Sequence, residues 1–248
     1  MIGTTVSGES TSPAVIFLHG GVINRHMWGP VIAHLNGEYR CIAVDIPGHG
    51  DRQKQDFRLE SSVATILETM ESLSVERAVL VGLSLGGYVA QAMAAKHPDQ
   101  VEGLLLSGAT VRYTGWDGLS TRLFGYVFPL FAKPAMKTFA AKMAEDLGQE
   151  LADQILEGGL SARGGAQALR RLPGADYAAA IAGFQGPIVL ANGERDAGNR
   201  DGEAYFLSQF PRAESIVIQD AGHACALQQP EAYAAVVRHI LSEITLQV

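Results

Sequence analysis

The sequence holds little cysteine and no long apolar segment. Only two cysteines occur among its 248 residues, Cys41 and Cys225, which excludes a disulfide framework and favours a reducing compartment such as the cytoplasm. No run approaches the roughly 20 apolar residues of a membrane helix. The first residues show no basic stretch followed by an apolar one, so we expect neither a signal peptide nor a membrane partner.

Basic residues are also scarce. The chain has 19 Lys and Arg against 26 Asp and Glu, a net charge of -7 at neutral pH, so we do not expect a nucleic-acid partner. Neither a metal-ligand spacing nor a dinucleotide fingerprint is present, and we expect no metal and no cofactor. With 47% hydrophobic residues, the chain is long enough for one large domain with an inserted subdomain. The sequence leaves the oligomeric state open.

Short apolar runs, each followed by a glycine-rich or polar turn, recur along the chain. They span residues 14–18, 41–44, 78–81, 104–106, 188–190 and 215–218. Runs that are apolar throughout are typical of strands buried on both faces, as in a parallel sheet. Amphipathic helical patterns over 63–73 and 236–244 lie between or after them. The alternation predicts an α/β fold with a doubly wound, mostly parallel sheet.

Residues 112–184 break this alternation. The segment has no strand pattern, and aromatic and methionine side chains are spaced among helix-forming residues. We therefore predict a core made of residues 1–111 and 185–248, with a helical cap over 112–184 that covers the ligand edge of the sheet. Most of the cap's aromatic residues are expected to pack within the cap itself.

The run from Gly82 to Gly86, with Ser84 at its centre, lies between a strand pattern and a helix of small residues. The flanking glycines suit a sharp turn in which the helix packs close to the strand. A serine at such a turn exposes its hydroxyl, which makes Ser84 a candidate covalent nucleophile. A packing turn without chemistry is the alternative, because the motif by itself also arises by chance.

Reactive residue types follow other predicted strands as well. His19 follows the first of them, Asp45 the second, and Asp196 and His223 follow the last two. The carboxyl ends of parallel strands meet at one edge of a sheet, where ligands bind. We therefore expect these side chains to gather around Ser84.

Taken together, these motifs resemble the α/β-hydrolase fold superfamily over nearly the whole chain. The matching pieces are His19-Gly20-Gly21, Asp45-x-Pro47-Gly48-His49-Gly50, the Ser84 turn with Gly86-Gly87, Gly193-x-x-Asp196 and Gly222-His223. Small capped esterases and lactonases, enol-lactonases included, are the most similar members. Only about a dozen residues precede the first clear strand, so one or both of the usual leading strands of this fold are expected to be reduced.

The resemblance implies a catalytic triad. Ser84 would be the nucleophile, His223 the base that takes and returns its proton, and Asp196 the acid that orients the imidazole. Asp201 and Glu194 lie close to Asp196 in the sequence and are rival positions for the acid.

The resemblance also implies an oxyanion hole and a substrate pocket. Backbone N–H groups of Gly21 and Leu85 would bind the oxyanion. An apolar acyl pocket is expected from Met27, Trp28, Leu85 and Leu227 together with some aromatic residues of the cap.

Arg25 and Cys225 can each be interpreted in two ways. Arg25 would meet a substrate carboxylate or would be a solvated loop charge. Cys225, two residues after His223, is expected to be a small apolar pocket residue rather than a reactive thiol, because no separate base is apparent for it. His19, Asp45 and His49 are expected to order their loops.

The predicted function is hydrolysis of a small-molecule carboxylic ester, thioester or lactone through an acyl-serine intermediate. Because one fold hosts many reactions, two alternatives stay open. The first is a cofactor-independent lyase, C–C hydrolase, perhydrolase or oxygenase that uses the same triad. The second is a receptor-like ligand-binding protein with slow hydrolysis.

Overall fold

A single sheet runs through the protein, whose computed structural model describes residues 1–35 and 37–245. Within these residues its strands stand in the order β1-β3-β2-β4-β5-β6-β7, and all pairs are parallel except β1 with β3. The predicted α/β fold class is confirmed. The strands are β1 (Thr4–Ser7), β2 (Ala14–Leu18), β3 (Arg40–Val44), β4 (Ala78–Leu83), β5 (Val101–Ser107), β6 (Ile188–Gly193) and β7 (Glu214–Ile218).

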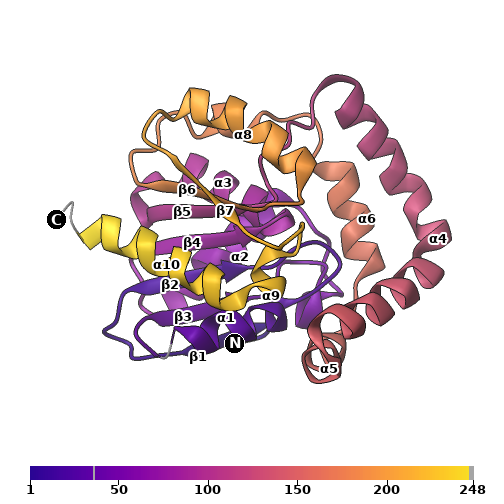
Figure 1. Cartoon of the computed structure of the whole chain (residues 1–248), viewed down its shortest axis with the longest axis horizontal. Helices are drawn as coiled ribbons and strands as arrows, with labels where there is room; N and C mark the ends of the chain where they lie inside the picture. Colours follow the sequence, from indigo (N-terminus) through magenta and orange to yellow (C-terminus); the bar gives the residue numbers. More distant parts are fainter. Residues whose placement is uncertain (36, 246–248) are drawn as a thin grey trace.

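Helices cover both faces of the sheet (Figure 1). Successive strand residues point to opposite faces, so Ile16 and Leu18 pack into one core and Val15 and Phe17 into the other. The first core is closed by α2 (Leu59–Ser72), α3 (Leu85–Lys96) and α8 (Ala197–Gln209). The second is closed by α1 (Gly29–His34), α9 (Cys225–Gln228) and α10 (Pro230–Thr245). Short 3-10 turns are η1 (Arg25–Trp28), η2 (Gly50–Arg52) and η3 (Pro98–Gln100).

Four helices lie between β5 and β6. They are α4 (Gly115–Leu147), α5 (Gln149–Glu157), α6 (Ala162–Arg171) and α7 (Tyr177–Ala180), and Figure 1 shows α4, α5 and α6 to one side of the sheet. All of residues 112–184 are described, and none of them is in a strand. Gly125 lets α4 approach α6 closely, because a β carbon there would lie 2.9 Å from that of Leu169. We keep 112–184 as the proposed cap.

Among the strands of the described residues, β1 is the one that the apolar runs did not predict. It pairs antiparallel with β3 at the edge of the sheet, and three of its four residues are exposed. An exposed edge strand needs no apolar run, which explains the missing signal. One short leading strand is thus present. Across the described residues, no helix is both long and apolar enough to cross a membrane.

Candidate active site

Ser84 occupies the turn between β4 and α3. Its backbone is in a strained region, with φ 51° and ψ -113°, which non-glycine residues rarely adopt. The turn is held by a 2.7 Å hydrogen bond from the Ser84 N–H to the Ser107 carbonyl, and by Gly87 N–H, which donates to the Ser84 carbonyl at 2.9 Å. This geometry matches a nucleophile turn, in which the serine hydroxyl stands out from the backbone.

The glycines of the motif are required for close approach. A β carbon at Gly82 would lie 2.5 Å from the backbone of Gly86, and one at Gly86 would lie 2.8 Å from the β carbon of Leu18. Both separations are too short for real atoms. Strand β4, helix α3 and the end of β2 can therefore meet behind Ser84 only if both positions lack a side chain.

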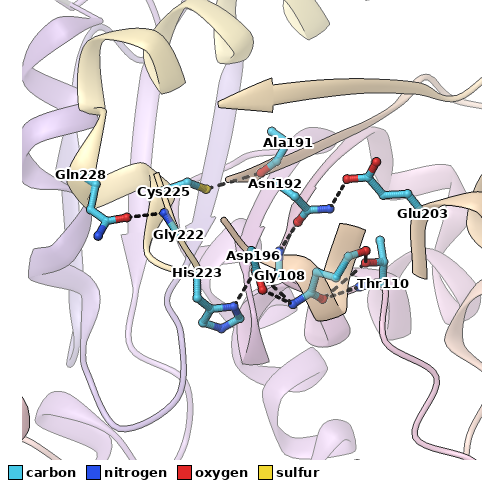
Figure 2. A network of polar contacts seen from close by, with 11 residues as sticks. Gly108, Thr110, Ala191, Asn192, Asp196, Glu203, Gly222, His223, Cys225 and Gln228 are labelled. Carbon is cyan, nitrogen blue, oxygen red and sulfur yellow. Dashed lines mark hydrogen bonds and ion pairs between the residues drawn. The ribbon is translucent and has the colours of Figure 1, made fainter. Parts of the chain in front are cut away.

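His223 and Asp196 form a hydrogen-bonded pair at the same edge of the sheet. His223 Nδ1 donates to Asp196 Oδ2 at 2.8 Å, as Figure 2 shows. Asp196 follows β6 and is largely covered, whereas His223 lies in the loop after β7 and is about half exposed. A carboxylate on Nδ1 leaves Nε2 as the nitrogen that can accept a proton. Neither of the rival acids, Asp201 and Glu194, makes this contact.

Asn199 supports the carboxylate of Asp196. Its Nδ2 lies 3.1 Å from both carboxylate oxygens, and its Oδ1 accepts from the Thr110 N–H at 3.2 Å. Burial alone would raise the pKa of Asp196. The hydrogen bonds from His223 and Asn199 outweigh burial, and the pKa lies below its ordinary value. The carboxylate therefore stays ionised at neutral pH and can stabilise an imidazolium.

The two expected oxyanion donors flank Ser84. Gly21 follows β2, and Leu85 is the first residue of α3, where the backbone N–H groups have no intrahelical partner. Both residues line the same cavity as Ser84 and His223. Apart from its two chain neighbours, no described residue has an atom within 4 Å of a β carbon placed on Gly21, so this backbone is open to a ligand. We propose these two N–H groups as the oxyanion hole.

A cavity of about 370 Å³ connects the core to the cap. Ser84 and His223 lie on its core side together with Leu85 and Leu227, and Phe128, Met136, Phe139 and Leu169 close it from the cap. Its size is within the range of small-molecule sites. The structure thus brings six of the predicted residues to one place: Gly21, Ser84, Leu85, His223, Leu227 and, through His223, Asp196.

Arg25 lies elsewhere. Its guanidinium forms an ion pair with the buried Asp45 and another with Asp51 at 2.9 Å, and its Nε donates to Thr5 at 3.0 Å. It is absent from the residues that line the cavity. Because Nε and Nη1 are held by Thr5, Asp45 and Asp51 and the residue does not line the cavity, Arg25 is left out of the proposed site.

Met27 and Trp28, expected in the acyl pocket, are also outside the cavity. Both are fully buried. The Trp28 ring packs against Phe17 and Tyr233, with ring centroids 5.2 and 5.7 Å apart. The 3-10 turn η1 directs them under the sheet instead of toward the ligand, so they belong to the core.

His19 and His49 are buried and neutral. His19 Nδ1 donates to the Gly20 carbonyl at 2.7 Å and its Nε2 accepts from the Ile46 N–H at 3.0 Å, which ties the loop after β2 to the loop after β3. Burial lowers the pKa of His19 to about 4 and that of His49 to about 3. Both histidines are therefore buried without carrying charge, and His19 holds together the two loops behind the oxyanion position.

Cys225 is a buried thiol. Its Sγ donates to the Ala191 carbonyl at 3.4 Å, and burial raises its pKa to about 11. A thiol with so high a pKa is protonated at neutral pH and is a weak nucleophile.

Two residues of the site carried no clear signal in the sequence. Asn199 stands three residues after Asp196, one helical turn along α8, and that spacing is a usable hint for a carboxylate partner. Gly108 follows β5 and donates its N–H to Asn192 Oδ1 at 2.6 Å (Figure 2). A β carbon at Gly108 would lie 2.6 Å from Cε1 of His223, and nothing in the local sequence around Gly108 indicates this proximity.

Comparisons with known proteins agree with this geometry. A family model described as the alpha/beta hydrolase family matches residues 15–236. 3-Oxoadipate enol-lactonase 1 of Acinetobacter baylyi is 23% identical over 98% of this chain and 94% of its own length. Pimeloyl-[acyl-carrier protein] methyl ester esterase of Neisseria meningitidis is 29% identical over 93% of this chain and 94% of its own.

A solved structure of similar fold comes from the thaumarchaeon Nitrososphaera gargenis. It is described among carboxylesterases and superposes with a TM-score of 0.81 at 18% identity, over 99% of this chain and 95% of that one. At this identity the likeness concerns the fold. The resemblance expected from the sequence motifs is confirmed: the chain belongs to the alpha/beta hydrolase family.

Proposed function

We propose that this protein is a serine hydrolase that cleaves a carboxylic ester, thioester or lactone through an acyl-Ser84 intermediate. The observation that carries the proposal is that the strained Ser84 turn and the paired His223 open into one cavity. The two relatives are named for a lactone and for a methyl ester. Both compounds contain a carbonyl carbon bonded to oxygen, the group that an activated serine attacks.

In the first half of the reaction, Ser84 Oγ attacks the carbonyl carbon while His223 Nε2 takes the hydroxyl proton. The resulting oxyanion accepts hydrogen bonds from the N–H groups of Gly21 and Leu85. The bond to the leaving oxygen or sulfur then breaks, and His223 gives its proton to that atom. Throughout, Asp196 holds the imidazole and balances its positive charge.

In the second half, water replaces the leaving group. His223 takes a proton from the water as its oxygen attacks the acyl carbon, and returns it to Ser84 Oγ as the acid leaves. These groups supply everything that acyl transfer requires, so we propose no metal and no cofactor.

The cytoplasm is the proposed location of the enzyme. Cys41 and Cys225 are free and buried, and two unpaired thiols suit a reducing compartment.

The test is labelling by a fluorophosphonate probe, read as intact-protein mass, together with turnover of short p-nitrophenyl esters and simple lactones. The wild type should gain one adduct and turn over an ester or lactone, and Ser84→Ala should do neither. Ser120→Ala, which removes an exposed serine of α4, is the matched control and should behave as the wild type. Equal ester hydrolysis by Ser84→Ala would contradict the proposal. An adduct without turnover would favour the receptor-like reading.

A further inference from the structure

The wall that the described residues form around Ser84 carries no carboxylate, ammonium or guanidinium group. None of the described residues that line it is Asp, Glu, Lys or Arg. Besides Ser84 and His223, the polar side-chain groups of the lining are the hydroxyls of Thr121, Tyr88 and Tyr113, and the Tyr88 hydroxyl already donates to the Val111 carbonyl at 3.0 Å. A substrate that enters this cavity therefore contacts mainly apolar groups.

The arginines on the elements around the cavity are bonded to other acceptors. They are Arg25, Arg112, Arg122, Arg163, Arg170 and Arg171. On the cap, Arg122 donates to the Pro173 carbonyl at 2.5 Å and Arg170 to the Gly125 carbonyl at 2.8 Å. Each is held by partners outside the cavity wall, so none of them offers a buried partner for a substrate carboxylate. A carboxylate brought into this cavity would lose its hydration without gaining an ion pair.

Both sides of the cavity are apolar. Phe128, Met136 and Phe139 of α4 face Leu85 and Leu227 of the core. Burial of hydrocarbon between these residues is favourable in proportion to the apolar area removed from water. The volume of about 370 Å³ corresponds to roughly twelve groups of the size of water or methylene, at about 30 Å³ each.

We propose that the acyl group of the substrate is an uncharged hydrocarbon chain of medium length, about six to ten carbons, seated between α4 and the core. This rests on the proposed serine hydrolase function. Under this proposal, a substrate whose acyl chain ends in a carboxylate is not a preferred one. A carboxylate-binding role of Arg25 would have favoured such a substrate.

The test compares kcat/KM for three p-nitrophenyl esters: acetate, hexanoate and the adipate half-ester, which has the six carbons of hexanoate and a terminal carboxylate. The wild type should prefer hexanoate to acetate by at least tenfold and to the adipate half-ester by at least a hundredfold. Turnover of the half-ester within tenfold of hexanoate, or a preference for acetate, would overturn the inference.

Two lysine variants on α4 test where the acyl group binds. Met136→Lys adds a cation to the cavity wall, and Leu130→Lys adds it to the outer side of the same helix, where Leu130 is 77% exposed. Met136→Lys should move the preference at least tenfold toward the half-ester, and Leu130→Lys should stay within twofold of the wild type. No shift in Met136→Lys, or equal shifts in both variants, would overturn the placement of the acyl chain.

Fluorophosphonate labelling separates the two possible failures. If Ser84 forms no adduct and no ester is turned over, the proposed hydrolase function itself fails. If Ser84 forms the adduct and acetate is turned over but hexanoate is not, the hydrolase function stands and the hydrocarbon-chain inference is wrong. An adduct without turnover of any ester counts against the hydrolase function itself.

Discussion

Gly108 lies against the imidazole of His223. A β carbon at Gly108 would lie 2.6 Å from Cε1 and 3.1 Å from Nδ1 of that ring, and its φ is +60°. The preceding residue, Ser107, accepts the hydrogen bond from the Ser84 N–H. Two consecutive residues at the end of β5 therefore touch both the nucleophile turn and the base, and they set the separation between them.

Gly108→Ala should lower kcat strongly without unfolding the protein. The new methyl group must displace the imidazole, and an error of about 1 Å in a catalytic group can reduce the rate about a hundredfold. The matched control is Gly115→Ala, because Gly115 has φ +58° with no atom within 4 Å of its β carbon. Both variants should lose about 1 kcal/mol of stability from backbone strain. Equal kcat values in the two variants would show that Gly108 does not position His223.

Asp196→Asn should reduce kcat by about 10³ to 10⁴-fold. The amide no longer fixes the tautomer of His223 or balances its charge. Asp201→Asn, the neighbouring acid on α8, should stay within twofold of the wild type. Steady-state rates of both variants on the same ester decide between the two positions. A larger loss of kcat in Asp201→Asn than in Asp196→Asn would make Asp201 the acid of the triad.

The stability of the protein should fall as the pH drops from about 6.5 toward 4. Burial lowers the folded-state pKa of His19 from 6.5 to about 4, so below pH 6.5 the unfolded chain binds a proton that the folded protein does not. Stability then rises with pH across this window, by roughly 3 kcal/mol for His19. Urea unfolding at pH 7, 6, 5 and 4.5 measures the slope.

His19→Asn tests the origin of that slope. The variant lacks the titrating ring and should show a shallower loss of stability between pH 6.5 and 4.5, while His34→Asn, at an exposed histidine, should keep the slope of the wild type. An unchanged slope in His19→Asn would contradict the assignment.

Arg25→Ala should act on stability and leave substrate binding unchanged. The substitution leaves the carboxylate of Asp45 buried without its guanidinium partner, which costs about 2 to 3 kcal/mol. KM for the neutral ester should change by less than twofold. Arg195→Ala, which breaks an exposed ion pair with Asp220, is the control and should change stability by less than 1 kcal/mol. A large rise in KM would restore Arg25 to the substrate site.

Cys225 should resist thiol reagents in the native protein. Its raised pKa and its buried position leave almost no thiolate at pH 8. Iodoacetamide should therefore leave esterase activity and native mass unchanged, and should modify Cys225 after unfolding in urea. Rapid native alkylation with loss of activity would show that the thiol is accessible.

Local signals were sufficient for the fold. Apolar runs predicted β2 to β6 because strands buried on both faces must be apolar along their whole length. The edge strand β7 was predicted from the apolar residues at its end, although its first two residues are exposed. The exposed edge strand β1 carries no such pattern, and it escaped prediction. The Ser84 motif was also predicted from the sequence. Gly82 is required by a contact with Gly86, four residues away, whereas Gly86 is required by the distant Leu18.

The sequence did not predict the direction in which individual side chains point. Met27 and Trp28 stand close to the oxyanion loop in sequence, yet the turn η1 sends them into the core. Arg25 has the charge to bind a carboxylate, and Asp45 already holds it. In each case the deciding contact comes from another segment of the chain.

By itself, then, the sequence determined the α/β architecture, the family and the order of serine, acid and histidine along the chain, since these depend on local periodicity and motifs. The tertiary structure alone decided that Gly108 faces His223, that Asn199 supports Asp196, and that the cavity is lined by carbon. Those properties arise where segments that are distant in the sequence pack together, and such contacts produce no periodic pattern in the sequence.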